Sequence, residues 1–552
     1  MTISQLKFFE RVWENFCPQK FSQFPPPPPF SSSRFLFSPF FSFFFLVLFA
    51  ALAYTFSIPQ EQALKWILAY FTLIVFLHPG NGIYFLTLII PFFLGDEKRP
   101  YFYLLDVMTL LTLVSAAFHF SFHREKTPNI PHRGKILLFL AVSLLSIPIN
   151  AKGLYYHLCG TPVPEIWNSF WSGQENSPVY YLRSLFHLIS NVSLYCITLW
   201  SFRNENDFQK WLKPFLCMNL LMWIFAYCFY FGNFPENTSY LSTSLIGHYP
   251  IEAGKLSLTG FAYNAGYLGE YWILAFPLIA VLLYSFKSHL FFSATAALTL
   301  ILGLAAIPFL YQRGTVIALS GQVLFFCAFW IWQSKNRLQT LKWASLFCLL
   351  YIFLYFFIDY FFLHSAGIIR LKNMFSHPSL RDKIWQVSLT MFTHHPLLGI
   401  GLGKFHYFFP EYCKLAEIPW EGHIRYVRTT AHNVYFHMLA EQGILGLSAF
   451  LFMLAAIFKT SITQFKKLEE AWKPHALGLL IALFGWACYG LTQHVFYIRS
   501  IQIFFWIVLG FLGMFYRPTL KSLSKETVLW RVLACAMVWI VLCVYRLTTI
   551  TA

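Results

Sequence analysis

The stretch from Leu298 to Trp332 reads LTLILGLAAIPFLYQRGTVIALSGQVLFFCAFWIW and contains one charged residue, Arg313. Two apolar runs, 289–310 and 314–333, flank the dipeptide Arg313-Gly314. Each run is close to the ~20 residues that a helix needs to cross a bilayer. The stretch therefore predicts two membrane-spanning helices joined by a short turn that holds the arginine.

The whole chain has the composition of a membrane protein. Hydrophobic residues make up 57% of the 552 residues and charged residues 11%, whereas soluble domains carry about 25% charge. No apolar run alternates as an outer-membrane barrel strand would. The sequence predicts an all-α polytopic membrane protein with about 12–15 transmembrane helices. The predicted spans are 35–57, 63–77, 82–94, 101–120, 136–150, 180–201, 211–231, 266–286, 289–310, 314–333, 341–363, 433–458, 475–494, 499–516 and 528–546.

The 40 basic residues outnumber the 23 acidic ones, but they do not indicate a nucleic-acid partner, because most lie in short loops between spans. Such loops are typical of the cytoplasmic face. From an inside N-terminus, the loops 151–179, 232–265 and 364–432 face outward. The clusters that share the cytoplasmic side are Arg124/Lys126/Arg133/Lys135, Arg203/Lys210/Lys213, Lys335/Arg337/Lys342, Lys459/Lys466/Lys467/Lys473 and Arg517/Lys521/Lys525.

The two ends of the chain differ from its middle. Residues 1–34 are basic, carry five prolines (25–29) and show no cleavable signal peptide, so we expect a cytosolic, extended tail. Residues 35–298 form the predicted N-terminal transmembrane region, and 517–552 hold a last predicted helix. Cys159 and Cys413 fall in outer loops, where a disulfide is permitted; two unpaired thiols are the alternative.

The outer loop 364–432 is far longer than ordinary connections, and loops beyond ~12 to 15 residues usually carry function. Within it, apolar residues recur at three and four positions after Arg381, a spacing that predicts a short amphipathic helix on the membrane surface, ended by Pro396. The residues of this pattern are Ile384, Trp385, Ser388, Leu389 and Phe392.

Glycines and histidines in the same loop raise two further possibilities. Gly399, Gly401 and Gly403 do not indicate a nucleotide site, because no strand precedes them and the GxGxxG spacing fails at Phe405. We expect a tight turn, or a close approach of backbone to a ligand. The loop histidines match no zinc spacing, so we expect them to be loop structure and predict no metal; they are His394, His395, His406 and His423.

The loop ends at His432. With Thr430 as N-cap, His432 and Asn433 would fall in the first turn of a helix. The positive end of that helix attracts phosphate and keeps an imidazole neutral. A base beside an anion site indicates transfer from a phosphorylated donor; hydrogen bonding to headgroups or backbone is the alternative. The stripe that this histidine would head comprises His432, Tyr435, Leu439, Gly443 and Gly446.

Two arginines strengthen the anion hypothesis. Arg313 lies in the nearly uncharged run Leu298–Trp332, and Arg381 begins the loop helix. An arginine in such a place is costly unless it meets an anion, and its planar fork suits phosphate oxygens. Arg313 and Arg381 are therefore the predicted anion-binding residues. Arg183 and Arg499, also at outward span ends, are weaker candidates that could instead snorkel to the surface; with Asn433 they are considered supporting residues.

His432-Asn433, nine residues, Gly443, two residues and Gly446 match the pattern H-[NSQ]-x9-G-x-x-[GTY]. Together with HPLLGIGLGKF (395–405) and the arginine motifs at 313 and 381, this region resembles the O-antigen ligase and polymerase superfamily of bacterial membrane glycosyltransferases. The resemblance covers roughly residues 300–500, and the predicted core domain is 299–516.

The resemblance implies a GT-C-like fold in the bacterial inner membrane, an active site facing the periplasm, an undecaprenyl-pyrophosphate-linked glycan donor, and no metal or cofactor. Arg313 and Arg381 would grip the pyrophosphate, and His432 would take the acceptor proton or hydrogen-bond the leaving phosphate. Lipid A-core is the expected acceptor, by analogy. A second lipid-linked glycan (a polymerase) or a protein (a protein O-oligosaccharyltransferase) are alternatives, as is a transporter of lipid-linked glycans, for which no inverted repeat is visible.

Overall fold

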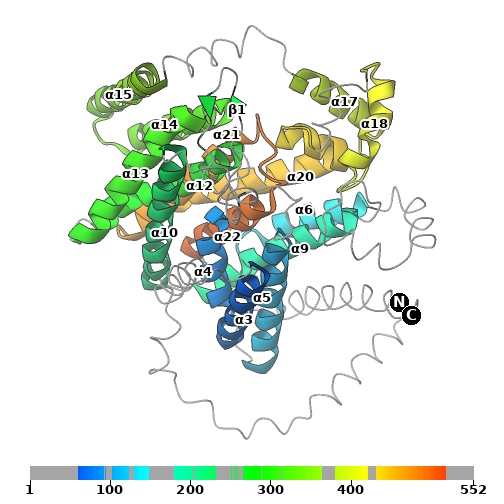
Figure 1. Cartoon of the computed structure of the whole chain (residues 1–552), viewed down its shortest axis with the longest axis horizontal. Coiled ribbons are helices and arrows are strands. Elements are labelled where there is room, and N and C mark those ends of the chain that lie inside the picture. The colour runs from blue at the N-terminus through cyan, green and yellow to red at the C-terminus, as the bar shows by residue number, and fades with distance from the viewer. Residues whose placement is uncertain are drawn as a thin grey trace, which may run out of the picture.

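A computed structural model of the chain describes residues 60–92, 94, 102–123, 130–147, 180–202, 205–231, 250–251, 255–256, 258, 265–286, 289–310, 312–363, 380–419 and 430–516. Figure 1 shows these residues as a bundle of tilted helices. Two short strands, β1 (Pro250–Ile251) and β2 (Lys255–Leu256), pair antiparallel, with Pro250 opposite Leu256. The predictions for the tail 1–34, the spans 35–57 and 528–546, the loop 151–179 and Cys159 lie outside the described residues.

Each predicted span within the described residues has a helix. Among the described residues, six helices are long and apolar enough to cross a membrane, which confirms an all-α polytopic membrane protein. The helices are α3 (Gln60–Leu77), α4 (Gly80–Ile89) with the 3-10 turn η2 (Ile90–Phe92), α5 (Phe102–His123), α6 (Arg133–Leu145), α9 (Tyr180–Ser201), α10 (Glu205–Phe231), α12 (Ala265–Ser285), α13 (Leu290–Leu310), α14 (Arg313–Gln333), α15 (Arg337–Leu363), α17 (Leu380–His394), α18 (Phe405–Leu415), α20 (Val434–Gln464) with the 3-10 turn η5 (Phe465–Lys467), α21 (Trp472–Tyr489) and α22 (Arg499–Phe515).

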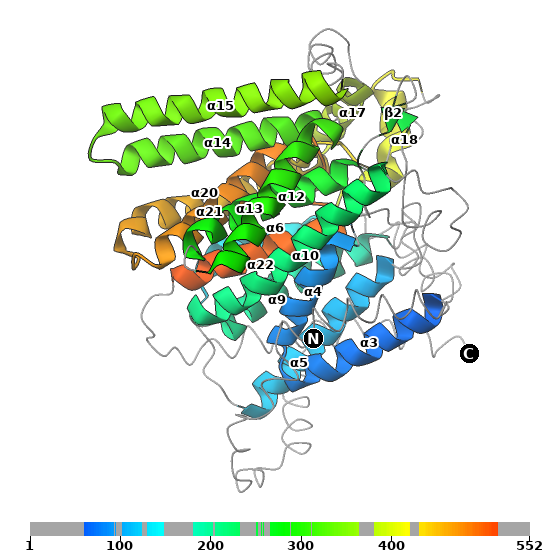
Figure 2. The ribbon, with the colours of Figure 1, turned by 60° about the vertical axis from the view of Figure 1, so that its left-hand side comes forward.

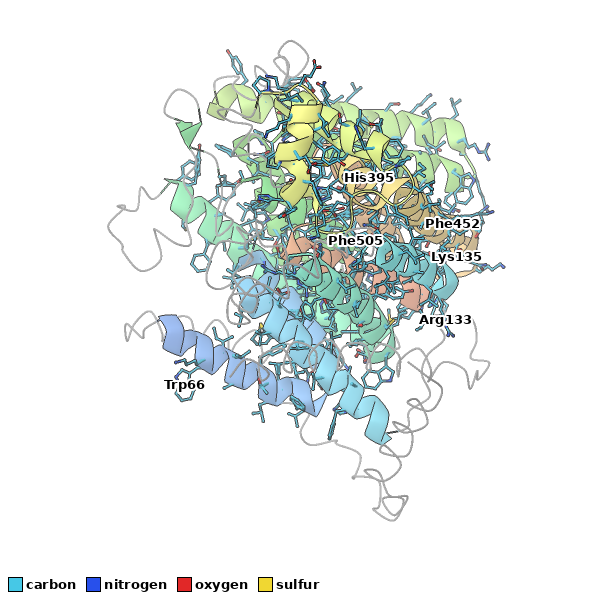
Figure 3. All side chains as sticks on the ribbon, turned by 90° about the vertical axis from the view of Figure 1, so that its right-hand side faces the viewer. Trp66, Arg133, Lys135, His395, Phe452 and Phe505 are labelled. Atoms are coloured by element: carbon cyan, nitrogen blue, oxygen red, sulfur yellow. The ribbon has the colours of Figure 1, made fainter. Side chains whose placement is uncertain are left out.

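Helix α22 lies at the centre of the bundle. Every residue from Arg499 to Met514 is buried, and α9, α21 and α12 pack around it. Figure 3 shows Phe505 in the middle of the molecule and Trp66 projecting from its edge. Helix α15 is the opposite case, because most of its large apolar side chains are exposed. Such a surface is what lipid tails would cover.

Several predicted cytoplasmic clusters lie at one end of the bundle. There α14 and η5 meet: Lys466 Nζ lies 5.3 Å from the ring centre of Trp332. Contacts of His475 with Ser285 and Phe208 bring α21, α12 and α10 to the same end. Three of the predicted cytoplasmic clusters therefore gather there, and Figure 2 shows α17 and α18 at the opposite end.

The predicted loop 364–432 is in part a folded unit. A helix after Arg381 is confirmed as α17, and it is followed by α18, which the sequence pattern did not reveal. The expectation that α17 rests on the membrane surface needs correction. Its buried residues Ile384, Val387 and Met391 pack with α18 and the start of α20, as does the free thiol of Cys413.

Helix α20 is interrupted at Gly443, which has φ 63° and ψ −166°. The segment 396–403 lies against the break and completes its hydrogen bonds: Ile400 N–H donates to Ala440 O (2.9 Å) and Ile444 N–H to Pro396 O (2.9 Å). Gly399 approaches the helix so closely that a Cβ would lie 2.3 Å from the carbonyl carbon of Glu441. The expected tight turn is confirmed, since Lys404 N–H donates to Gly401 O (3.2 Å). The close backbone approach is made to the helix itself.

We predict that Gly443→Ala strongly lowers the apparent melting temperature in detergent. Its conformation is essentially reserved for glycine and costs ~1–3 kcal/mol with a side chain, and a Cβ would lie 2.4 Å from the carbonyl carbon of Leu397. The control is Gly134→Ala, because a Cβ at Gly134 would meet nothing within 4 Å. Equal melting temperatures for the two variants would contradict the role assigned to the helix break.

Candidate active site

His432 stands just outside α20 in a left-handed backbone conformation, with φ 48°. The predicted N-cap, Thr430, is wrong: Asn433 caps the helix, since its side-chain oxygen accepts from Tyr435 N–H (2.9 Å) and Phe436 N–H (3.0 Å). An asparagine side chain directly before the helix outcompetes a threonine three residues earlier. His432 is therefore a strained residue at the helix mouth and lies outside the first turn, so the predicted helical stripe does not begin with it.

The connection between α21 and α22 holds this mouth in place. Val434 N–H donates to Gly490 O (2.8 Å) and the Asn433 amide donates to Leu491 O (2.8 Å). His432 Nδ1 lies 3.2 Å from Gln493 Oε1. Because an amide oxygen only accepts, Nδ1 carries the proton and Nε2 keeps its lone pair. The geometry thus sets the tautomer that a general base requires.

The imidazole of His432 is kept neutral. Its pKa is lowered from 6.5 to about 4, first because the ring is removed from water and then because the charge of Arg381 acts on it; the bond to Gln493 works in the other direction. The sequence predicted a neutral ring from the helix dipole, whereas the main cause here is burial. His494, whose ring centre lies 4.8 Å from that of His432, has its pKa lowered for the same first reason.

Arg381 belongs to the same cluster as His432 and His494. It sits in the first turn of α17, and its Nη1 donates to the carbonyl oxygen of Thr492 (2.7 Å). One turn further, Trp385 Nε1 donates to Ala431 O (2.9 Å), next to His432. The charge of Arg381 acts on both His432 and His494. The structure therefore brings together the predicted base and one of the two predicted anion-binding arginines.

Arg313 reaches the cluster through its backbone. It begins α14, and the next residue, Gly314, packs so tightly that a Cβ would lie 2.6 Å from Thr492 Oγ1. The side chain of Arg313 is half-buried and makes no hydrogen bond or ion pair in the part of the chain that the structure describes. The start of α14 thus adjoins the connection that also carries Arg381.

Arg183 and Arg499 do not behave as the sequence suggested. Both are fully buried and neither snorkels to the surface. They meet the carboxylate of Asp106, which is 3.3 Å from Arg183 Nη2 and 2.5 Å from Arg499 Nε. His187 contacts the same carboxylate at 3.2 Å. Because the carboxylate of Asp106 links the two arginines inside the bundle, we assign them to the structure of the bundle and leave them out of the site.

A second layer of polar contacts supports His432. Glu441 Oε1 accepts from Phe405 N–H (3.0 Å) and lies 3.3 Å from His437 Nε2, while His437 Nδ1 accepts from Ala431 N–H (3.2 Å). This chain of bonds fixes the residue directly before His432. The sequence analysis missed it, although His437 and Glu441 stand four residues apart, the spacing of neighbours on one helix face.

The connection 490–498 was also missed. The predicted span 475–494 absorbed Gln493 and His494, but α21 ends at Tyr489. Two adjacent polar residues between apolar runs were the available signal for this connection. Of the loop histidines considered for a metal, His423 lies outside the described residues. Among the described ones, no group of three His, Cys, Asp or Glu side chains is placed to hold a metal ion.

Residues 298–451 match a family model described as O-antigen ligase. The match runs from α13 into α20 and includes Arg313, Arg381 and His432, and it confirms the resemblance to the O-antigen ligase superfamily for this part of the chain. No curated protein matches the chain. The family implies a glycosyltransferase-like ligase activity on a lipid-linked glycan in a multi-pass membrane protein.

The buried imidazole predicts a pH-dependent stability. Between pH 6.5 and 4 the unfolded chain takes up a proton at His432 that the folded protein does not, so stability is lost as the pH falls through this window. We expect the melting temperature of the wild type to fall more steeply there than that of His432→Gln. His394→Gln, at an exposed position of α17, should keep the wild-type slope. Equal slopes for wild type and His432→Gln would refute the neutral imidazole.

Proposed function

We propose that this protein transfers a glycan from undecaprenyl pyrophosphate to an acceptor at the periplasmic face of the bacterial inner membrane, with lipid A-core as the acceptor. One observation carries the proposal: Arg381 and a neutral His432 are bonded to neighbouring residues of a single connection, Thr492 and Gln493. A fixed cation beside a neutral base is what glycosyl transfer from a pyrophosphate donor needs.

In the proposed reaction, the acceptor hydroxyl oxygen forms a bond to the anomeric carbon of the donor sugar. The bond from that carbon to the phosphate oxygen breaks, and its electron pair leaves with undecaprenyl pyrophosphate. Arg381, joined by Arg313 from the start of α14, stabilises the negative charge that grows on the leaving oxygen. His432 Nε2 takes the proton of the acceptor hydroxyl.

The arrangement favours the base role of His432 over the alternative role as hydrogen-bond donor to the leaving phosphate. Because Nδ1 donates to Gln493, the ring could donate through Nε2 only if it were protonated. With a pKa of about 4, it is neutral at pH 7. The charge of Arg381 opposes protonation, and a bound pyrophosphate would offset that charge. We therefore infer that His432 becomes an effective base only when the donor is in place.

The acceptor separates the remaining alternatives. A second lipid-linked glycan would make the protein an O-antigen polymerase, and a protein hydroxyl a protein O-oligosaccharyltransferase. A transporter would move the lipid-linked glycan without forming a new glycosidic bond. Purified protein in liposomes, offered the donor with each acceptor in turn, distinguishes these functions by the product formed.

We predict that His432→Gln lowers transfer ~10²- to 10⁴-fold, the usual contribution of a general base. Arg381→Gln should lose a comparable factor, while Arg381→Lys keeps the charge and loses the planar fork, so it should fall between. Initial rates in the liposome assay provide the measurement. His394→Gln is the control and should retain full activity. Wild-type rates in His432→Gln would remove the catalytic assignment.

The side of the membrane on which the site lies gives a separate prediction. Lys383 on α17 and Lys467 on η5 are both exposed and lie at opposite ends of the bundle. In intact spheroplasts, a membrane-impermeant maleimide should label Lys383→Cys, and it should label Lys467→Cys only after lysis. The reverse pattern would place the site on the cytoplasmic side and overturn the proposed localisation.

A further inference from the structure

Glu270 is a buried acid that the mechanism above does not use. It lies on α12, its exposed fraction is 1%, and neither carboxylate oxygen has a hydrogen-bond partner within the described part of the chain. A buried acceptor without a hydrogen-bond partner is destabilising. A residue with this cost and no structural bond needs another explanation.

The surroundings of Glu270 connect it to the candidate active site. One turn earlier on α12, the carbonyl of Gly266 accepts from Tyr489 Oη (3.2 Å), and Tyr489 Oη also lies 3.2 Å from Thr315 Oγ1. The ring of Tyr489 would touch a Cβ placed on Gly314, at 3.2 Å. Residues i and i+4 share a helix face, so Glu270 lies on the face of α12 that turns towards Tyr489.

The charge of Arg381 provides the second connection, since it acts on Glu270 and on Tyr489. Yet Glu270 does not form a hydrogen-bonded ion pair with the arginine, whose Nη1 is directed at the carbonyl of Thr492. Asp106 shows what a structural acid looks like in this protein, because both of its oxygens contact cationic side chains or histidine. Glu270 lacks such contacts and keeps its lone pairs.

We propose that Glu270 binds hydroxyl groups of the sugar next to the bond that is broken or formed. The inference rests on the proposed function. A pyrophosphate has the arginines as its partners. Neighbouring hydroxyls of a sugar ring are neutral donors and match the two oxygens of a carboxylate. A sugar held there would lie beside the pyrophosphate bound at Arg381.

The hydroxyls could belong to the donor sugar or to the acceptor sugar, and binding measurements distinguish the two. We expect Glu270→Gln to leave the affinity for sugar-free undecaprenyl pyrophosphate unchanged within about twofold. If the donor sugar is bound, the affinity for the glycan-linked donor falls ~10-fold, because hydrogen bonds to the sugar are lost. If the acceptor sugar is bound, the KM for the acceptor rises by the same factor. Glu411→Gln, an exposed acid on α18, is the matched control.

Stability separates this role from a structural one. Removing an unsatisfied buried acid should leave the melting temperature of Glu270→Gln equal to or above that of the wild type. A variant that is destabilised or does not fold would overturn the proposal. So would a variant that binds sugar-free undecaprenyl pyrophosphate more tightly while its affinities for the sugars are unchanged. That result would make Glu270 only a counter-charge of Arg381. If the wild-type protein neither binds the glycan-linked donor nor transfers the glycan from it, the proposed function itself is refuted.

If the wild type does both, and Glu270→Gln has the same affinity for the donor and the same KM for the acceptor, only this inference is refuted.

Discussion

The hydrogen bond from Arg381 to the carbonyl oxygen of Thr492 joins the outer segment to the bundle, and the candidate site depends on it. The carbonyl belongs to the connection 490–498, which also receives the N-H of Val434 and the amide of Asn433. The Thr492 carbonyl fixes the position of the guanidinium, whose charge acts on His432.

The break in α20 also depends on hydrogen bonds from a distant segment of the chain. In a membrane protein, irregular backbone is tolerated only where protein or water satisfies its hydrogen bonds. Here the segment 396–403 supplies them at Gly443, and the two backbones come so close that glycine is required on both sides, at Gly399 and Gly443. The glycine-rich segment and the histidine motif, which are separate in the sequence, are thus two halves of one backbone contact. That contact sets the position of the first half of α20, and His432 lies just before the start of this helix.

Two buried acids illustrate how satisfied and unsatisfied groups differ in role. Asp106 links Arg183 and Arg499 among α5, α9 and α22, and each of its oxygens contacts a cationic side chain. The carboxyl oxygens of Glu270 have no hydrogen-bond partner among the described residues, and the charge of Arg381 acts on this group. The contacts of Asp106 indicate a structural role. For Glu270 we propose sugar hydroxyls as the partners.

The sequence by itself determined the membrane fold, because spans such as 180–201 and 289–310 follow from local apolar composition, and the observed helices begin and end within a few residues of them. It also singled out His432 through a local motif, Arg313 through the cost of a lone charge among apolar residues, and Arg381 through its place at the start of the loop helix. Only the tertiary structure decided which arginines adjoin the histidine, that Asn433 is the cap, and that Gln493, His494 and Glu270 lie near the site. These depend on contacts between residues far apart in the chain, such as the one between Arg381 and Thr492. Local sequence patterns do not reveal such contacts. A charged residue at the end of a span has the same local pattern whether its partner is a ligand or a buried aspartate.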